Sequence, residues 1–178
     1  MKLVVLDRDG VINHDSDQFI KSPDEWLPLP GSLEAIALLC QFGYRIVVAT
    51  NQSGVGRGLF DMATLASIHD KMCKAVSLAG GRIDAIFFCP HTQDEHCDCR
   101  KPRPGMLREI AARFGCDLHG LPCVGDAVRD AQAAAAVGAQ AHLVLTGKGE
   151  KSRFDPALPD GTQVHSDLAA FAAALVGT

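Results

Sequence analysis

Short apolar segments alternate along this chain with stretches of helical spacing, and this alternation restricts the fold more than any other feature. A chain that alternates strands and helices forms a parallel sheet with helices packed on both faces. We therefore predict a three-layer, Rossmann-like α/β fold. The segments predicted as strands are residues 2–6, 45–50, 83–89, 121–125 and 142–146. The stretches predicted as helices are residues 33–42, 62–79, 104–114, 127–137 and 168–176.

The size of the chain fits one such domain. Its 178 residues, 47% hydrophobic and 21% charged, have the composition of an ordinary globular protein. We expect a single domain over residues 1–178, because this length is sufficient for one hydrophobic core. No segment between the predicted strands is long enough to form a second domain, so we also expect that no cap domain covers the sheet.

Charge and hydropathy argue against several kinds of partner. A formal net charge of −4 argues against nucleic acid or an anionic membrane as the main partner. The apolar stretch at residues 168–176 is much shorter than the ~20 residues that cross a bilayer, and the run after Lys2 is too short for a signal peptide. We expect a cytoplasmic protein. Because there is no extended basic or apolar interaction stretch, we expect a monomer.

The sequence Asp7-Arg8-Asp9-Gly10 follows the first predicted strand directly. Ligands of open α/β sheets bind at the carboxyl ends of the strands, which is where these two carboxylates lie. Two acids two residues apart suit a hard metal ion and a carboxylate that attacks phosphorus. The same motif also occurs in calcium loops and ordinary turns, so it does not decide between these interpretations alone.

Other predicted strands also end in polar residues. Thr50 ends the second strand, Asp126 follows the fourth, and Lys101 stands just before a predicted helix. We expect these side chains to meet Asp7 and Asp9 at one edge of the sheet. A phosphate monoester is an anion that repels a carboxylate nucleophile unless cations neutralise both. A metal ion held by the aspartates, together with the lysine, supplies that neutralisation.

Each of these residues also has a purely structural interpretation. Thr50 is also explained as a threonine at a strand end, Lys101 as a solvated loop lysine, and Asp126 as the N-cap of the next helix. Asp130 is explained equally well as a residue that orients the site or as a surface residue. The catalytic interpretation is favoured because all the polar segments occur together.

A second cluster of metal-binding residue types lies between the third predicted strand and Lys101. Three thiols and one imidazole match the ligands of a tetrahedral structural zinc site. His96 is an alternative to His91, although the Cys-x-His and Cys-x-Cys spacing favours His91. Four protein ligands would close the coordination sphere, so we expect a structural zinc ion that fixes the loop 89–101. The predicted ligands are Cys89, His91, Cys97 and Cys99.

The order and content of these motifs resemble those of the haloacid dehalogenase-like phosphohydrolase superfamily, over roughly residues 2–146. The resemblance implies a Mg²⁺-dependent phosphatase in which Asp7 attacks phosphorus and becomes an aspartyl-phosphate. It implies that Asp9 is the general acid toward the leaving group and then the general base toward water. Thr50 and Lys101 would stabilise the transferring phosphoryl group. The implied Mg²⁺ ligands are Asp7, the Asp9 carbonyl oxygen and Asp126.

The zinc loop, together with Asp7-Arg8-Asp9-Gly10-Val11-Ile12-Asn13, narrows the resemblance. The chain is similar to the D-glycero-D-manno-heptose 1,7-bisphosphate 7-phosphatases and to the related histidinol-phosphate phosphatases. Many of these enzymes have a lysine directly after the fourth-motif aspartate, where this chain has Ala127, so Arg57 or Arg129 would have to replace that contact. The residues implied to bind substrate are Asp15, Ser16, Asp17, Gln18, Asn51, Gln52, Ser53, Arg57 and Arg100.

The resemblance therefore implies removal of the C7 phosphate of D-glycero-D-manno-heptose 1,7-bisphosphate, in the synthesis of lipopolysaccharide precursors. The expected partner of the protein is a small phosphorylated sugar, and the expected cofactors are Mg²⁺ and structural Zn²⁺. Two alternatives remain open at this point: a histidinol-phosphate phosphatase, and a zinc-stabilised module that binds phosphate without turnover.

Overall fold

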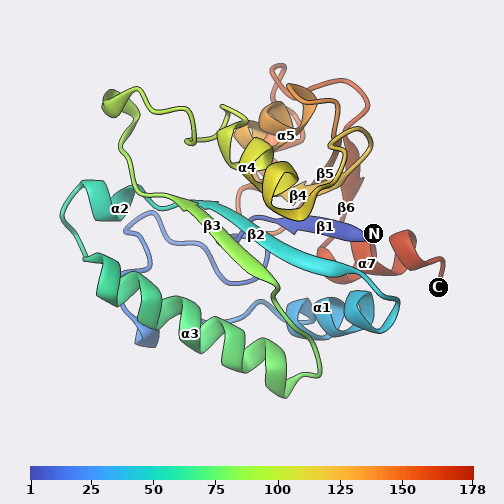
Figure 1. Ribbon diagram of the computed structural model, residues 1–178, viewed down its shortest axis with the longest axis horizontal. Coiled ribbons are helices and arrows are strands. Elements are labelled where there is room, and N and C mark those ends of the chain that lie inside the picture. The colour runs from blue at the N-terminus through green and yellow to red at the C-terminus, as the bar shows by residue number, and fades with distance from the viewer.

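A six-stranded parallel sheet forms the centre of the computed structural model, which describes residues 1–178 (Figure 1). The strands lie in the order β3-β2-β1-β4-β5-β6. Helices cover both faces, which confirms the predicted three-layer fold, and no cap domain is evident. The strands are β1 Leu3–Leu6, β2 Arg45–Asn51, β3 Ala85–Cys89, β4 Pro122–Gly125, β5 Gln140–Val144 and β6 Gln163–His165.

The longer helices divide between the two faces of the sheet (Figure 1). One face is covered by α1 Ser32–Gln41, α3 Met62–Leu78 and α7 Leu168–Val176, and the other by α4 Gly105–Phe114 and α5 Val128–Ala135. None of these helices is long and apolar enough to cross a membrane. Short helical turns lie in the connections: η1 Pro23–Glu25, α2 Ser53–Gly56, η2 Gln93–Glu95 and α6 Gly149–Ser152.

The first strand is buried on both faces, because alternate side chains of a strand point to opposite sides. Val4 and Leu6 pack into the core under α1, α3 and α7. Leu3 and Val5 pack into the core under α4 and α5. This two-sided burial explains why the strand is apolar throughout its length.

The position of β1 in the sheet determines where a ligand can bind. Leu6 pairs with Val48 of β2 on one side and with Val124 of β4 on the other. The chain builds the sheet outward from β1 to β3 and then returns to place β4 on the opposite side of β1. The carboxyl ends of β1 and β4 therefore flank the point at which the strand order reverses, which is where open α/β sheets bind their ligands.

Three strands of the sheet differ from the prediction by more than one residue. One of them, β3, begins at Ala85, two residues later than expected. The fifth strand begins at Gln140 and ends at Val144, two residues earlier than expected, because Thr146 leaves the sheet and its hydroxyl donates to the carbonyl of Gly10 at 2.6 Å. The sixth strand, β6, is absent from the prediction. It has three residues, it pairs with β5 alone, and its sequence Gln-Val-His has no apolar run.

Candidate active site

The predicted catalytic residues meet at the carboxyl edge of the sheet. Asp7 directly follows β1, Thr50 is the second-last residue of β2, and Asp126 directly follows β4. Asp7 and Thr50 border a polar cavity of ≈ 220 Å³, and Asp126 lies beside Asp7 without bordering it. The residues that line it and were predicted from sequence are Asp7, Asp9, Asp15, Ser16, Asp17, Thr50, Asn51, Gln52, Ser53, Arg57 and Arg100. Gln18, also predicted, is exposed and does not border the cavity.

Lys101 is fixed beside Asp7 by three contacts. Its Nζ lies 3.2 Å from Oδ1 of Asp7 and 2.6 Å from Oδ1 of Asp130, and it donates to the Ala49 carbonyl at 2.8 Å. Burial opposes the charge on Lys101, but Asp130 and Asp7 outweigh burial and raise its pKa above the ordinary value. Lys101 is therefore a buried ammonium group next to the candidate nucleophile. Asp130, for which the sequence allows either a site or a surface role, is buried and paired with Lys101.

Asp7 and Asp126 form a pair of buried carboxylates, and the positive charge around them is too small to keep their pKa values at the ordinary level. Burial raises the pKa of Asp7 to about 6, although Lys101 acts in the opposite direction. Burial, Asp130 and Asp7 raise the pKa of Asp126 to about 8. Carboxylate oxygens of Asp7, Asp126 and Asp130 lie within 4.8 Å of one another, and Asp130 is already paired with Lys101. The remaining two acids are hard oxygen donors that fit a divalent cation such as Mg²⁺.

Two glycines leave room for the Asp126 carboxylate. A Cβ at Gly10 or at Gly147 would collide with Oδ2 of Asp126, and both glycines have positive φ values of +81° and +57°. The same oxygen accepts the backbone N–H of Lys148 at 2.8 Å. The loops that follow β1 and β5 are thus fitted closely around the carboxylate that follows β4.

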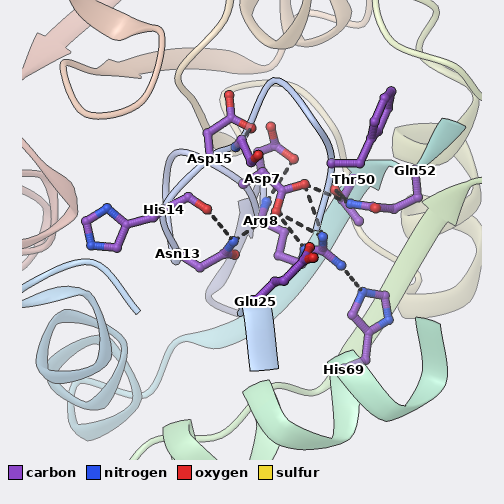
Figure 2. A network of polar contacts seen from close by, with 12 residues as sticks. Asp7, Arg8, Asn13, His14, Asp15, Glu25, Thr50, Gln52 and His69 are labelled. Atoms are coloured by element: carbon purple, nitrogen blue, oxygen red, sulfur yellow. Dashed lines mark hydrogen bonds and ion pairs between the residues drawn. The ribbon is translucent and has the colours of Figure 1, made fainter. Parts of the chain in front are cut away.

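Asp9 is held by hydrogen bonds from three side chains, Arg8, Asn13 and Gln52, which are labelled in Figure 2. Arg8 forms an ion pair with it at 2.9 Å, Asn13 Nδ2 donates to Oδ1 at 2.9 Å, and Gln52 Nε2 donates to Oδ2 at 3.0 Å. Burial opposes ionisation of Asp9, but Arg8 and the hydrogen bonds outweigh burial and lower its pKa. Gln52 also donates to the Thr50 hydroxyl at 3.0 Å, which connects Asp9 to the end of β2.

The predicted zinc ligands come together in the loop after β3. Sγ of Cys89 lies 3.0 Å from Sγ of Cys99 and 3.6 Å from Sγ of Cys97, and Nδ1 of His91 lies 3.3 Å from Sγ of Cys99. All four ligand atoms lie within 4.8 Å of one another, an arrangement that fits one tetrahedral ion. His96 is exposed and is not part of the cluster.

The end of this loop is joined to β2 by a pair of hydrogen bonds. Asn51 Nδ2 donates to the Lys101 carbonyl at 3.1 Å, and the Lys101 N–H donates to Asn51 Oδ1 at 3.0 Å. Asn51, predicted to contact substrate, therefore also holds the backbone of Lys101 in register with the catalytic edge. A metal ion in the Cys/His cluster would fix this backbone from the other end.

Comparison with known proteins decides the family. The chain is 59% identical over 176 residues, covering 99% of this chain and 98% of the relative, to the D-glycero-beta-D-manno-heptose-1,7-bisphosphate 7-phosphatase of Bordetella bronchiseptica. A family model described as HAD-hydrolase-like matches residues 98–171. The chain belongs to the HAD-like hydrolases.

Two further comparisons agree with this. The hydrolase is 52% identical to the phosphatase of the same name from Pseudomonas aeruginosa, over 98% of this chain and 97% of the relative. Its fold matches a crystal structure of D,D-heptose 1,7-bisphosphate phosphatase from B. bronchiseptica complexed with magnesium and phosphate. That match has a TM-score of 0.98 and covers 99% of both chains.

The structure of the HAD-like hydrolase adds one cation that sequence reasoning did not assign, Lys148, and brings Arg129, one of the two arginines named above, to the same cavity. Arg129 borders the cavity, as does Lys148, whose Nζ lies 2.9 Å from Oδ2 of Asp15. Ala127 is buried and adds no charge. Arg129, at the start of α5, is therefore placed to supply positive charge that Ala127 lacks. The sequence feature that could have indicated Lys148 as a site residue is its position just after the strand predicted at residues 142–146. Phe19 and Ile20 also border the cavity.

Proposed function

We propose that this hydrolase removes the C7 phosphate of D-glycero-D-manno-heptose 1,7-bisphosphate during the synthesis of lipopolysaccharide precursors. The observation that carries the proposal is the match, over almost the whole of both chains, to a phosphatase named for that substrate. The buried pair Asp7 and Asp126, next to Lys101, supports it because a phosphomonoesterase needs a carboxylate nucleophile, a metal site and a fixed cation.

The metal site is proposed at Asp7, Asp126 and the Asp9 carbonyl oxygen. A bound Mg²⁺ would neutralise negative charge on the phosphate and on the nucleophile. The observation of this structure that supports the site is the closeness of the buried carboxylates of Asp7 and Asp126, whose oxygens lie within 4.8 Å of one another. Burial accordingly raises the pKa of both acids.

The reaction is proposed to proceed in two steps. An oxygen of Asp7 attacks phosphorus, and the bond from phosphorus to the C7 oxygen breaks. Asp9, which takes up a proton as the phosphate dianion binds beside it, gives that proton to the leaving oxygen. A water then attacks the aspartyl-phosphate, Asp9 takes a proton from it, and inorganic phosphate leaves as Asp7 is restored. Lys101 and the Thr50 hydroxyl stabilise the charge on the phosphoryl group throughout.

Recognition of the sugar and of its second phosphate is proposed to come from the loops around the cavity. Arg57, Arg100 and Arg129 supply positive charge on its wall, and the segments 15–17 and 51–53 supply hydrogen-bonding groups. No cap domain is evident, so these loops must define the specificity. Gln18 lies off the cavity and has no part in this proposal.

The Cys/His cluster is proposed to hold a structural Zn²⁺. Its four ligands would complete the coordination sphere, and no position is left for a reacting water. The ion would fix the loop that ends at Arg100 and Lys101. We further propose that residues 1–178 act as one domain, as a monomer, in the cytoplasm.

A substrate panel tests the proposed function. With released phosphate as the readout, we expect the largest kcat/KM for the heptose bisphosphate, measured with both anomers. Asp7→Asn should abolish release, whereas Asp24→Asn, at an exposed site on η1, should not. A larger kcat/KM for histidinol phosphate would instead identify the related phosphatase. Phosphate release by the wild-type protein that is no greater than that of Asp7→Asn, for every ester of the panel, would leave only a phosphate-binding module.

Arg100→Ala tests recognition separately from chemistry. We expect a larger loss of kcat/KM for the heptose bisphosphate than for a small phosphate ester, because Arg100 lies on the cavity wall. Arg108→Ala, on the exposed side of α4, is the matched control. Equal losses on both esters would remove the recognition role of Arg100.

A further inference from the structure

Arg8, between the two catalytic aspartates, is completely buried, at 0% exposure. Its guanidinium lies along one side of the Asp9 carboxylate: Nε donates to Oδ1 at 3.0 Å, and Nη2 donates to Oδ2 at 3.2 Å. Such a two-point contact fixes the orientation of a carboxylate as well as its charge. Arg8 does not border the cavity, so it cannot touch a substrate bound there.

The far side of the Arg8 guanidinium is held by α3. Nη1 of Arg8 lies 3.0 Å from Nε2 of His69, and Figure 2 shows this contact reaching from the loop after β1 to the helix. A guanidinium has only donors, so the imidazole nitrogen must accept. His69 is therefore neutral, with its own proton on Nδ1. Burial and Arg8 lower its pKa to about 4, in agreement with this state.

The contacts on Asp9 divide into two groups. Arg8 and Asn13 are fully buried and do not border the cavity, whereas Gln52 does border it. The carboxylate is thus held rigidly from inside the protein. Only the Gln52 hydrogen bond comes from the cavity wall, where it can be exchanged for one to a substrate oxygen.

We propose that Arg8 and His69 are positioning residues that hold the Asp9 carboxylate in the orientation required for proton transfer to the leaving oxygen. The proposal rests on the proposed phosphatase reaction. In that reaction the bond between Asp7 and phosphorus forms as the ester bond breaks, and the leaving alkoxide takes the proton of Asp9. General acid catalysis of this kind contributes ~10²–10⁴ in rate and depends on the placement of the acid.

The proposal predicts an effect that depends on the leaving group. An alkyl phosphate releases a strongly basic alkoxide and needs the proton of Asp9. An aryl phosphate such as 4-nitrophenyl phosphate releases a stable phenolate without it. Loss of the His69 contact should therefore slow the first step for an alkyl ester and leave it nearly unchanged for an aryl ester.

The test substitutes His69, because replacing the buried Arg8 itself endangers folding. His69→Leu removes the acceptor, whereas His69→Gln keeps one in a similar place. His142→Leu is the matched control: His142 is as buried as His69, at 7%, and its Nδ1 contacts His165 at 3.0 Å, far from Asp9 on β5. Single-turnover rates are measured by rapid quench for the heptose bisphosphate and by stopped flow for 4-nitrophenyl phosphate, and KM and kcat are measured for both.

We expect His69→Leu to lower kcat and the single-turnover rate on the heptose bisphosphate by roughly tenfold or more, with little change in KM. Release of 4-nitrophenolate should change by less than about threefold, since that step needs no acid. His69→Gln should restore most of the rate, and His142→Leu should affect neither ester selectively.

Equal losses of His69→Leu on both esters, or no loss on either, would overturn the positioning role. Failure of the underlying function gives a different result. If the wild-type protein hydrolyses another primary alkyl phosphate but not the heptose bisphosphate, the substrate assignment fails, and the same comparison is made on that alkyl ester. If the wild-type protein turns over no phosphate ester, both proposals fail.

Discussion

The ammonium nitrogen of Lys101 lies 2.6 Å from Oδ1 of Asp130, and each of the two side chains is only 7% exposed. Asp130 also accepts the backbone N–H of Ala127 at 3.0 Å, which fixes the carboxylate at the start of α5. The position of Lys101 beside Asp7, which follows β1, therefore depends on α5, the helix that follows β4. An ion pair of this kind is sensitive to the removal of either partner, because the other is left as an uncompensated buried charge.

Asp130→Asn should both destabilise the protein and impair the reaction. We expect a loss of about 3 kcal/mol in the free energy of unfolding, measured by urea titration, because Lys101 would lose its nearest counter-charge. We expect kcat to fall by roughly tenfold or more as Lys101 shifts. The control is Asp70→Asn, which breaks the exposed pair with Lys74 and should cost at most about 1 kcal/mol. Similar costs for the two variants would contradict the role of the buried pair.

In the metal-free protein, the stabilising contribution of Asp7 and Asp126 should decrease as the pH rises from about 4 to about 8. Asp7 and Asp126 have folded-state pKa values of about 6 and about 8, above their ordinary 3.8, so the folded state binds protons more tightly than the unfolded chain in this window. Deprotonation of these acids also prepares them for a cation. Added Mg²⁺ should therefore raise the melting temperature more at about pH 8 than at about pH 5.

The control for this prediction is Asp126→Asn, which removes one proposed ligand. Its melting temperature should respond weakly to Mg²⁺ at both pH values. A wild-type response of the same size at the two pH values would contradict the assignment of Asp7 and Asp126 as the metal-binding pair.

Cys97→Ser should lower the bound zinc, measured by elemental analysis, well below one ion per chain. The loop 89–101 would lose its fixed end, so we expect KM for the heptose bisphosphate to rise roughly tenfold through displacement of Arg100. Cys116→Ser, at a partly buried thiol outside the cluster, is the matched control. Zinc content that stays at one ion per chain in Cys97→Ser would exclude this cluster as the site.

His142 should make the protein less stable in acid. Burial and the neighbouring His165 lower its pKa to about 4 from an ordinary 6.5. As the pH falls through 6.5 the unfolded chain takes up this proton first, so stability is lost until the pH reaches about 4. Between about pH 7 and pH 4.5, wild-type protein should lose about 2 kcal/mol more than His142→Leu, measured by urea titration. Equal losses would mean that His142 is not buried as a neutral group.

The parts of the fold that the sequence predicts well are those where burial leaves a clear pattern. The strands at residues 2–6 and 45–50 are buried on both faces and therefore appear as unbroken apolar runs. The strand β6 escapes prediction because it is short, largely exposed and polar. The sequence predicts the fifth strand two residues too late for a different reason, since its boundary depends on a contact between Thr146 and Gly10 from distant parts of the chain.

The residues of the candidate site also divide into those that the sequence predicts and those that only the folded structure reveals. Asp7, Asp9, Asp126 and the cysteines stand out because their spacing is local. The partner of Asp130 and the contact between Arg8 and His69 join segments that are far apart in sequence, so only the packing of helices on the sheet reveals them. Lys148 reaches the cavity on a loop whose path depends on the same packing.

The two glycines around Asp126 have a consequence for natural variation and for protein engineering. Gly10 and Gly147 need a backbone conformation that other residues rarely adopt, and any side chain at either position would occupy the space of the Asp126 carboxylate. Neither glycine carries a functional group, yet an alanine at either position should be as damaging as the loss of the aspartate itself. Variant libraries aimed at changing the substrate range should therefore leave both positions fixed and place diversity in residues 15–17, 57 and 129.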